Sequence, residues 1–222
     1  MIVKRAAISH SKHRNMFGLV GIEADSEKKE IHVKLARQWS RDKLNTIPLE
    51  IKKIHNKIMW DTTYTDQLVG EHFIQALRRD HNLRIQVINT QKNLKDPDDI
   101  EKVKTMDKVE MVQWMLTIFQ DHQIKFPEKR SRHMEELTSQ IAIFTEHKTE
   151  AGNIDYFAPG EEYDNLVKAL MITCFSVRNM ISKNVSIEHV GGGIPHKPDT
   201  LAMSNPDYKT DSDVIEALTR KW

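Results

Sequence analysis

Short apolar runs alternate along this chain with segments whose apolar residues recur at helical spacing, and this alternation constrains the fold more than any other feature. Four runs rich in β-branched or alternating apolar residues predict strands at residues 18–24, 30–39, 57–64 and 83–90. Between the second and third, Ile47, Ile51 and Ile54 lie on one side of a predicted short helix at 47–57. Strands alternating with helices predict an α/β fold, with a mixed sheet flanked by helices on both faces.

Longer helices are predicted by apolar periodicity at residues 66–80, about 100–122, 130–147 and 162–183. Thr65 or Asp66 is expected to cap the first of these helices. Residues 153–162, which contain Pro159–Gly160, predict a loop before the last helix.

The chain of 222 residues, 39% of them hydrophobic, is long enough for one substantial core. We expect a basic N-terminal extension at 1–16, one domain at 17–183 and a flexible tail at 184–222, where Gly, Pro and polar residues accumulate.

Composition excludes several classes of protein. No stretch approaches the roughly 18–20 apolar residues of a membrane span, and the start is too polar for a signal-peptide core, so we expect an intracellular protein without a membrane partner. The single cysteine, Cys174, lies in an apolar helical segment and is expected in the core. A net charge of +1 does not by itself indicate a nucleic-acid-binding protein, although local basic clusters exist, one of them at 129–132.

Three acidic residues lie where predicted elements end or begin: Glu23, Asp61 and Asp164. Such residues can converge at one sheet edge, and because clustered carboxylates repel one another, a divalent cation is their natural partner. Two Mg²⁺ or Mn²⁺ ions roughly 3.5–4 Å apart would activate water and stabilise the leaving oxygen in phosphodiester cleavage. The three acids therefore predict a metal-dependent nuclease, although each acid alone also fits a turn or a helix cap.

The segments GLVGIEAD, IMWDTTYTD and APGEEYDNLVKAL, in this order and spacing, resemble the nuclease domain of viral large terminase subunits. These are the DNA-packaging motors of tailed viruses, and their nuclease belongs to the ribonuclease H-like superfamily. The resemblance covers residues 17–183 and implies that Glu23, Asp61 and Asp164 are the catalytic, metal-binding acids.

Two positions depart from the family's pattern. The family usually has Asp where this chain has Glu23, and Asp25 is a nearby substitute. The family's adjacent pair of acids before the last helix is here Asp164 and Asn165, with Glu162 close by as a further candidate ligand. These departures leave open a non-catalytic ribonuclease H-like module that binds nucleic acid or a protein, and the shared fold also leaves open a resolvase for branched DNA.

Other catalytic motifs are missing from the sequence. It contains no HExxH, no GxSxG and no GxxxxGK[ST] phosphate loop, and one cysteine cannot build a cysteine-rich zinc site. The resemblance implies a metal-dependent DNA endonuclease that uses two Mg²⁺ or Mn²⁺ ions during viral DNA packaging. Its expected partners are double-stranded DNA and other packaging-motor components, in the host cytoplasm.

Overall fold

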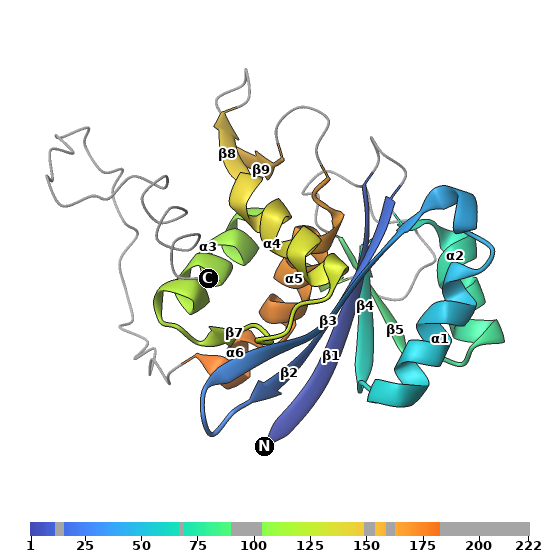
Figure 1. Ribbon diagram of the computed structural model, residues 1–222, viewed down its shortest axis with the longest axis horizontal. Coiled ribbons are helices and arrows are strands. Elements are labelled where there is room, and N and C mark those ends of the chain that lie inside the picture. The colour runs from blue at the N-terminus through green and yellow to red at the C-terminus, as the bar shows by residue number, and fades with distance from the viewer. Residues whose placement is uncertain (12–15, 67–68, 90–103, 149–153, 159–162, 183–222) are drawn as a thin grey trace, which may run out of the picture. The chain divides into compact units, whose positions relative to one another are not determined.

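The computed structural model describes the chain except for residues 12–15, 67–68, 90–103, 149–153, 159–162 and 183–222. The predicted tail therefore lies outside the described residues. In the described part, a sheet of seven strands has the order β6-β5-β4-β1-β2-β3-β7 (Figure 1). Its strands are β1 (Ile2–Ser11), β2 (Met16–Asp25), β3 (Glu30–Ser40), β4 (Thr62–Asp66), β5 (Ile85–Asn89), β6 (Lys104–Thr105) and β7 (Ile124–Lys125).

The sheet is mixed. β1, β2 and β3 form an antiparallel meander, whereas β4 pairs with β1, β5 with β4, β6 with β5 and β7 with β3 in parallel. The expected mixed sheet of an α/β fold is confirmed.

Strand β1 differs from the sequence prediction. Residues 1–16 were expected to be an extension, but Ile2–Ser11 lies in the middle of the sheet between β2 and β4. Lys4 and Arg5 give this segment a polar start, yet the four residues from Ala6 to Ser9 are fully buried because both faces of the strand are covered.

Helices cover both faces of the sheet (Figure 1). On one face, α5 (Asn165–Ser176) packs against β1 and β2, and α3 (Lys108–Gln120) and α4 (Arg132–Ile143) pack against α5. Apart from Lys168, every residue of α5 from Asn165 to Phe175 is buried, as expected of a helix that is apolar on nearly all sides. Cys174 is among these residues, so its predicted place in the core is confirmed.

The other face carries α1 (Ile47–Ile58), α2 (Glu71–Gln75) and the π-helix η3 (Ala76–Asp80). Their apolar residues form one core with Ile8, Phe17 and Leu19 of the sheet, and the rings of Phe17 and Phe73 stack with centroids 5.0 Å apart. Burial of such side chains contributes roughly 1.5–3 kcal/mol each. This core fixes the position of the strands whose ends form the candidate site.

A second sheet, of two strands, is formed by residues that the sequence predicted to be the end of a helix and a loop. The helix expected over 130–147 ends at Ile143, and β8 (Thr145–Lys148) then pairs with β9 (Ile154–Phe157), which was expected to be a loop. Two short elements complete the described chain, η1 (Arg41–Lys43) and α6 (Arg178–Ile181).

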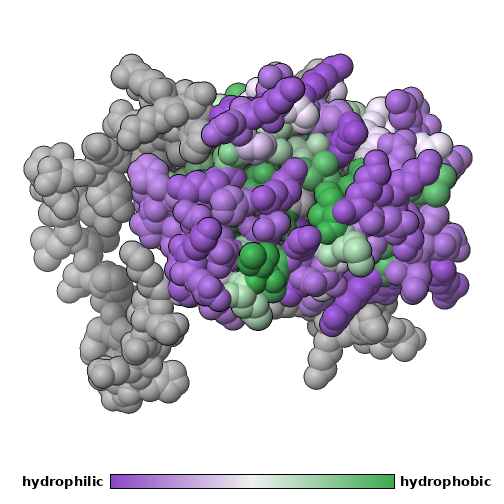
Figure 2. All heavy atoms as spheres, turned by 60° about the horizontal axis from the view of Figure 1, so that its bottom comes forward, coloured by the Kyte–Doolittle hydropathy of each residue, from purple (hydrophilic) through white to green (hydrophobic). Residues whose placement is uncertain are grey.

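The surface is mainly hydrophilic on the face that Figure 2 shows, where hydrophobic residues form only a few small patches. The exposed large hydrophobic residues of the described part are Met1, Ile2, Leu49, Met59 and Phe157. Patches of this kind are ordinary on soluble domains. No helix in the described ranges is long and apolar enough to cross a membrane.

Candidate functional site

Three of the predicted site residues lie at the amino end of β1. Glu23 of β2 pairs with Lys4 of β1, and Asp25 follows two residues later. Asp61 directly precedes β4, where its carboxylate accepts a hydrogen bond from the Lys4 backbone N–H at 2.9 Å and lies 3.3 Å from the Arg5 guanidinium. The Asp61 carboxylate thus ties the start of β4 to the start of β1.

Asp25 has a local structural role. Its carboxylate accepts hydrogen bonds from the backbone N–H groups of Glu27 at 2.9 Å and Lys28 at 3.4 Å in the turn after β2. The Glu27 N–H is the main cause that lowers the pKa of the Asp25 carboxyl below its ordinary value. These contacts are those of a turn-forming Asp.

Asp164 lies near the opposite end of the sheet. The residue after it, Asn165, packs so closely on Gly18 of β2 that a Cβ at Gly18 would be 2.8 Å from the Asn165 Nδ2. The step along β2 from Gly18 to Glu23 spans about 17 Å, at roughly 3.4 Å per residue. The structure therefore separates Asp164 from the acids at the amino end of β1.

The separation has a topological cause. The sequence prediction took residues 18–24 as the first strand of the sheet, so that Glu23 would lie at the same edge as the other acids. Those residues belong to β2, which runs antiparallel to the preceding β1, so Glu23 lies at the amino end of β1, and Asp61 lies there too because it precedes the parallel strand β4. Asp164, beside Gly18, lies at the carboxyl end of β1. The further candidate Glu162 lies outside the described residues.

A different set of side chains lies at the carboxyl ends of β1 and β4. Ile8 pairs with Thr65 in the parallel register, so the next residues, Ser9 and Asp66, are neighbours on adjacent strands. Asp66 is 5% exposed, and Ser9 is fully buried with no hydrogen-bond partner for its Oγ among the described atoms. Sites in α/β sheets collect outside the carboxyl ends of strands. Sequence reasoning gave Asp66 only as a helix cap and did not single out Ser9. The available signals were the apolar residues 6–8 before Ser9 and the strand-favouring threonines and tyrosine at 62–65 before Asp66.

The start of α5 completes this site. The Asp164 carboxylate lies 2.6 Å from the Lys168 ammonium one turn later, and both side chains are largely buried. Asp164 occupies the N-cap position but makes no side-chain cap hydrogen bond. Gln140 of α4 supplies that cap, because its Oε1 accepts hydrogen bonds from the N–H groups of Leu166 at 2.8 Å and Val167 at 3.3 Å.

Asn165 is the centre of an amide cluster. Its Oδ1 accepts hydrogen bonds from the Nε2 of Gln38 at 3.1 Å and the Nε2 of Gln140 at 3.5 Å, while its own Nδ2 is buried with no partner among the described atoms. Asn165 is fully buried. The residue next to Asp164 therefore offers an amide and not a second carboxylate.

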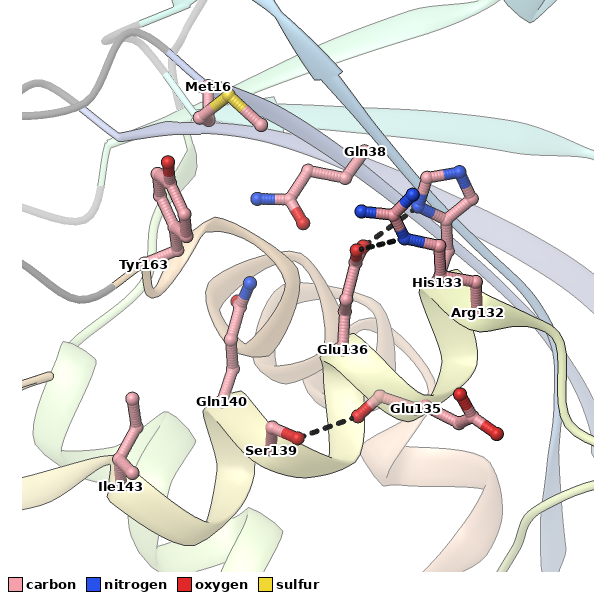
Figure 3. Close-up of a pocket in the computed structure, with 10 residues that line it drawn as sticks. All are labelled: Met16, Gln38, Arg132, His133, Glu135, Glu136, Ser139, Gln140, Ile143 and Tyr163. Atoms are coloured by element: carbon pink, nitrogen blue, oxygen red, sulfur yellow. Dashed lines mark hydrogen bonds and ion pairs between the residues drawn. The ribbon is translucent and has the colours of Figure 1, made fainter.

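A cavity of about 600 Å³ opens beside this cluster between α4 and the sheet. Figure 3 shows Gln38 in its middle, with Tyr163 on one side and Glu136 on the other. Glu136 accepts from Arg132 Nε at 3.1 Å and lies 2.9 Å from Nδ1 of His133. The cavity is thus lined by amide and charged groups next to the candidate site.

These residues do not fit a pair of divalent ions. Within the described ranges, no group of three or more His, Cys, Asp or Glu side chains is placed to hold a metal ion. At the candidate site Ser9 offers a hydroxyl and Asn165 an amide, and the described carboxylates there are Asp66 and Asp164, the latter paired with Lys168. Two hard cations need several carboxylate oxygens.

Comparison with known proteins identifies the fold. No protein-family model matches the sequence, and no curated protein does. Among solved structures, the large terminase nuclease from thermophilic phage G20c with bound magnesium matches with a TM-score of 0.56 at 11% identity, over 78% of this chain and 81% of that chain. The nuclease domain of the large terminase subunit gp2 of bacterial virus Sf6 gives 0.51 at 11%, over 78% and 87%. This chain has the large terminase nuclease fold.

The expected ribonuclease H-like fold is therefore confirmed. The bacteriophage HK97 large terminase also matches, with a TM-score of 0.57 at 11% identity over 79% of this chain, but this chain spans only 40% of that longer protein. At such identities the likeness establishes the terminase nuclease fold, and function has to be inferred from the site.

Proposed function

We propose that this domain of terminase nuclease fold binds double-stranded DNA without cleaving it. The observation that carries the proposal is the set of side chains at the carboxyl end of β1 and the start of α5: a serine hydroxyl at Ser9 beside Asp66, an amide at Asn165, and a lysine ammonium at Lys168 that is paired with Asp164. The DNA partner follows from the likeness to large terminases. Other packaging-motor components and the host cytoplasm are the corresponding partners and location.

The Asp164–Lys168 ion pair supports the absence of a metal. An ammonium 2.6 Å from the carboxylate already neutralises it, and the pair is largely buried, so solvent screens it little. A divalent ion would have to displace Lys168 and leave that ammonium without its counter-charge, at a cost of several kcal/mol for a buried group. The Lys168 ammonium therefore competes with a metal ion for the Asp164 carboxylate.

The second candidate is a metal-dependent endonuclease that cleaves DNA during viral packaging with Mg²⁺ or Mn²⁺. It is favoured by the two carboxylates, Asp66 and Asp164, at the same end of the sheet, with Glu162 as the nearest acid in sequence to complete the set. Solved terminase nucleases with bound magnesium and with bound cobalt show that this fold accepts divalent ions.

A cleavage assay on supercoiled plasmid separates the two candidates. With Mg²⁺, Mn²⁺ or EDTA we expect no nicking, and we expect the protein to bind a labelled duplex in EDTA, without any metal. Metal-dependent nicking that is lost in Asp66→Asn and Asp164→Asn, but retained in the matched control Asp61→Asn, would establish the endonuclease instead. Loss of nicking in Asp61→Asn alone would move the site to the amino end of β1.

Thermal unfolding gives a readout that needs no activity. A ligand at 100 times its Kd stabilises a protein by about 2.7 kcal/mol, which raises Tm by roughly 5–10 °C in a domain of this size. Millimolar Mn²⁺ should leave the wild-type Tm unchanged. The combined variant Ser9→Asp, Asn165→Asp and Lys168→Ala should gain such a shift. A shift of that size in the wild type would contradict the proposal.

A further inference from the structure

The cavity between α4 and the sheet lies on the same row of the sheet as the carboxyl-end site. Ser9 of β1 pairs with Gly18 of β2, and Gly18 pairs with Gln38 of β3. Residues directly opposite each other in antiparallel strands share a face, and the close approach of Asn165 to Gly18 shows that this is the face covered by α5. Two strand spacings, roughly 10 Å, separate Ser9 from Gln38. This is less than the width of a B-DNA major groove, about 12 Å, so DNA that lies over the site also lies over the cavity.

The charged side chains of the cavity lie on α4 and are paired with one another. The Glu136 carboxylate accepts a hydrogen bond from Arg132 and lies 2.9 Å from Nδ1 of His133. Figure 3 shows this group at one side of the cavity and the Glu135 carboxylate turned away from Gln38. The other described lining residues are neutral, namely Met16, Gln38, Ser139, Gln140, Ile143 and Tyr163. Because the arginine of this lining is already paired, the cavity favours a neutral group with hydrogen-bonding edges over a phosphate.

The amide of Gln38 is available to such a group. Among the described residues its head makes one hydrogen bond, in which Nε2 donates to the Oδ1 of Asn165 at 3.1 Å. Gln140, by contrast, uses its Oε1 to cap α5 and its Nε2 to contact Asn165. The Oε1 and second Nε2 hydrogen of Gln38 therefore offer an acceptor and a donor side by side, the pattern that pairs with the edge of a base, adenine above all.

Tyr163 supplies an aromatic ring beside this amide. It is half-buried, and Figure 3 shows it across the cavity from Glu136, with Met16 on the same side. An aromatic ring for the face of a base, together with polar side chains for its edge, is the usual means by which proteins hold unstacked bases. A base inside a duplex is stacked on both faces, so only a base that has left the stack can enter.

We infer that the cavity binds a single unpaired nucleobase of the DNA, with the Gln38 amide on its edge and the Tyr163 ring on its face. The inference rests on the proposed DNA binding and names the form of DNA that the domain prefers, a duplex that carries an unpaired base. The volume of about 600 Å³ lies within the range of pockets that enclose a small molecule, roughly 300–1,000 Å³.

The test compares three labelled DNAs of the same sequence: a paired duplex, this duplex with one extra adenine, and this duplex with one extra abasic residue. The abasic bulge has the backbone of the adenine bulge but no base. Fluorescence anisotropy should show that the wild type binds the adenine bulge roughly fivefold or more tightly than either other DNA. Equal binding of the two bulges would overturn the inference, because the protein would then recognise the backbone or its flexibility.

Substitutions test whether this cavity is responsible. Tyr163→Ala and Gln38→Ala should each remove the preference for the adenine bulge. Tyr163→Phe keeps the ring and should retain it, as should Gln113→Ala, a matched control at an exposed glutamine of α3 that does not line the cavity. Because Gln38 also holds Asn165, Tyr163→Ala decides the question if Gln38→Ala lowers Tm. A preference that survives Tyr163→Ala in a folded protein, shown by circular dichroism, would overturn the assignment.

The outcomes separate the inference from the proposal on which it rests. A wild type that binds none of the three DNAs contradicts the proposed function and the inference with it. A wild type that binds all three equally overturns only the inference. Millimolar adenosine monophosphate tests a free nucleotide as the occupant: it should leave the preference for the adenine bulge unchanged, and loss of that preference would assign the cavity to a free nucleotide instead.

Discussion

Replacing Gln140 tests the link between α4 and α5 most directly. This side chain is 5% exposed, and its Oε1 is the acceptor for the N–H groups of Leu166 and Val167 at the start of α5. Gln140→Met keeps a similar volume but removes the acceptor, and with it the long Nε2 hydrogen bond of 3.5 Å to Asn165, which Gln140→Glu removes as well. A buried donor without a partner costs about 1–3 kcal/mol, and the longer bond of 3.3 Å contributes less than the shorter one of 2.8 Å. We therefore expect a loss of roughly 2–4 kcal/mol in the free energy of unfolding.

Urea unfolding followed by circular dichroism measures this loss, and the expected fall in Tm is about 5–15 °C. Gln140→Glu is the matched control, because it retains an oxygen acceptor and places a negative charge at a helix N-terminus, where such a charge is favourable. It should cost clearly less than Gln140→Met. A Met variant within about 0.5 kcal/mol of the wild type, or a Glu variant that loses as much as Met, would refute the reasoning.

Three further predictions concern single sites. Gly18→Ala should destabilise the domain by about 1–3 kcal/mol, because the new Cβ would lie 2.8–2.9 Å from Asn165. Gly21→Ala, whose new Cβ would have its nearest contact at 3.5 Å, should cost less, and chemical denaturation of both variants measures the difference. Met59→Gly should stabilise by about 0.5 kcal/mol, measurable as a raised Tm, because Met59 is 71% exposed and holds a left-handed φ of 57°. Burial raises the pKa of the Cys174 thiol, so a thiolate-specific reagent at pH 8 should label it only on unfolding; rapid labelling of the native protein would contradict this.

Elements with a strong local pattern could be predicted from the sequence. The helix predicted at 47–57 is α1, and the strands predicted at 30–39 and 83–90 correspond to β3 and β5. β1 could not be predicted in this way, because Lys4 and Arg5 interrupt its apolar run and its strand conformation depends on burial between two other strands. Its burial comes from partners that are distant in sequence.

The candidate site was only partly predictable for the same reason. Asp164 could be placed at a helix start because a helix start has a local signature, and its role in the site stays a prediction. The sequence predicted Asp66 as a helix N-cap, because the local sequence around an acid at the end of a strand is similar to that around an acid at the start of a helix. Which strand ends share an edge depends on strand direction, which no local pattern encodes. The role of Gln140 is likewise invisible in sequence, since its partners Leu166 and Val167 come more than twenty residues later.

The central position of β1 has a consequence for the order of folding. On one side it pairs with β2, the next strand in the chain, and on the other it pairs with β4, where Arg5 meets Thr62 across 57 residues. Closing the larger loop costs more entropy, so the meander of β1, β2 and β3 should form before the parallel half docks. Because Asp66 ends β4 and Asp164 precedes α5, the carboxyl-end site forms only when these long-range contacts with β1 and β2 are made.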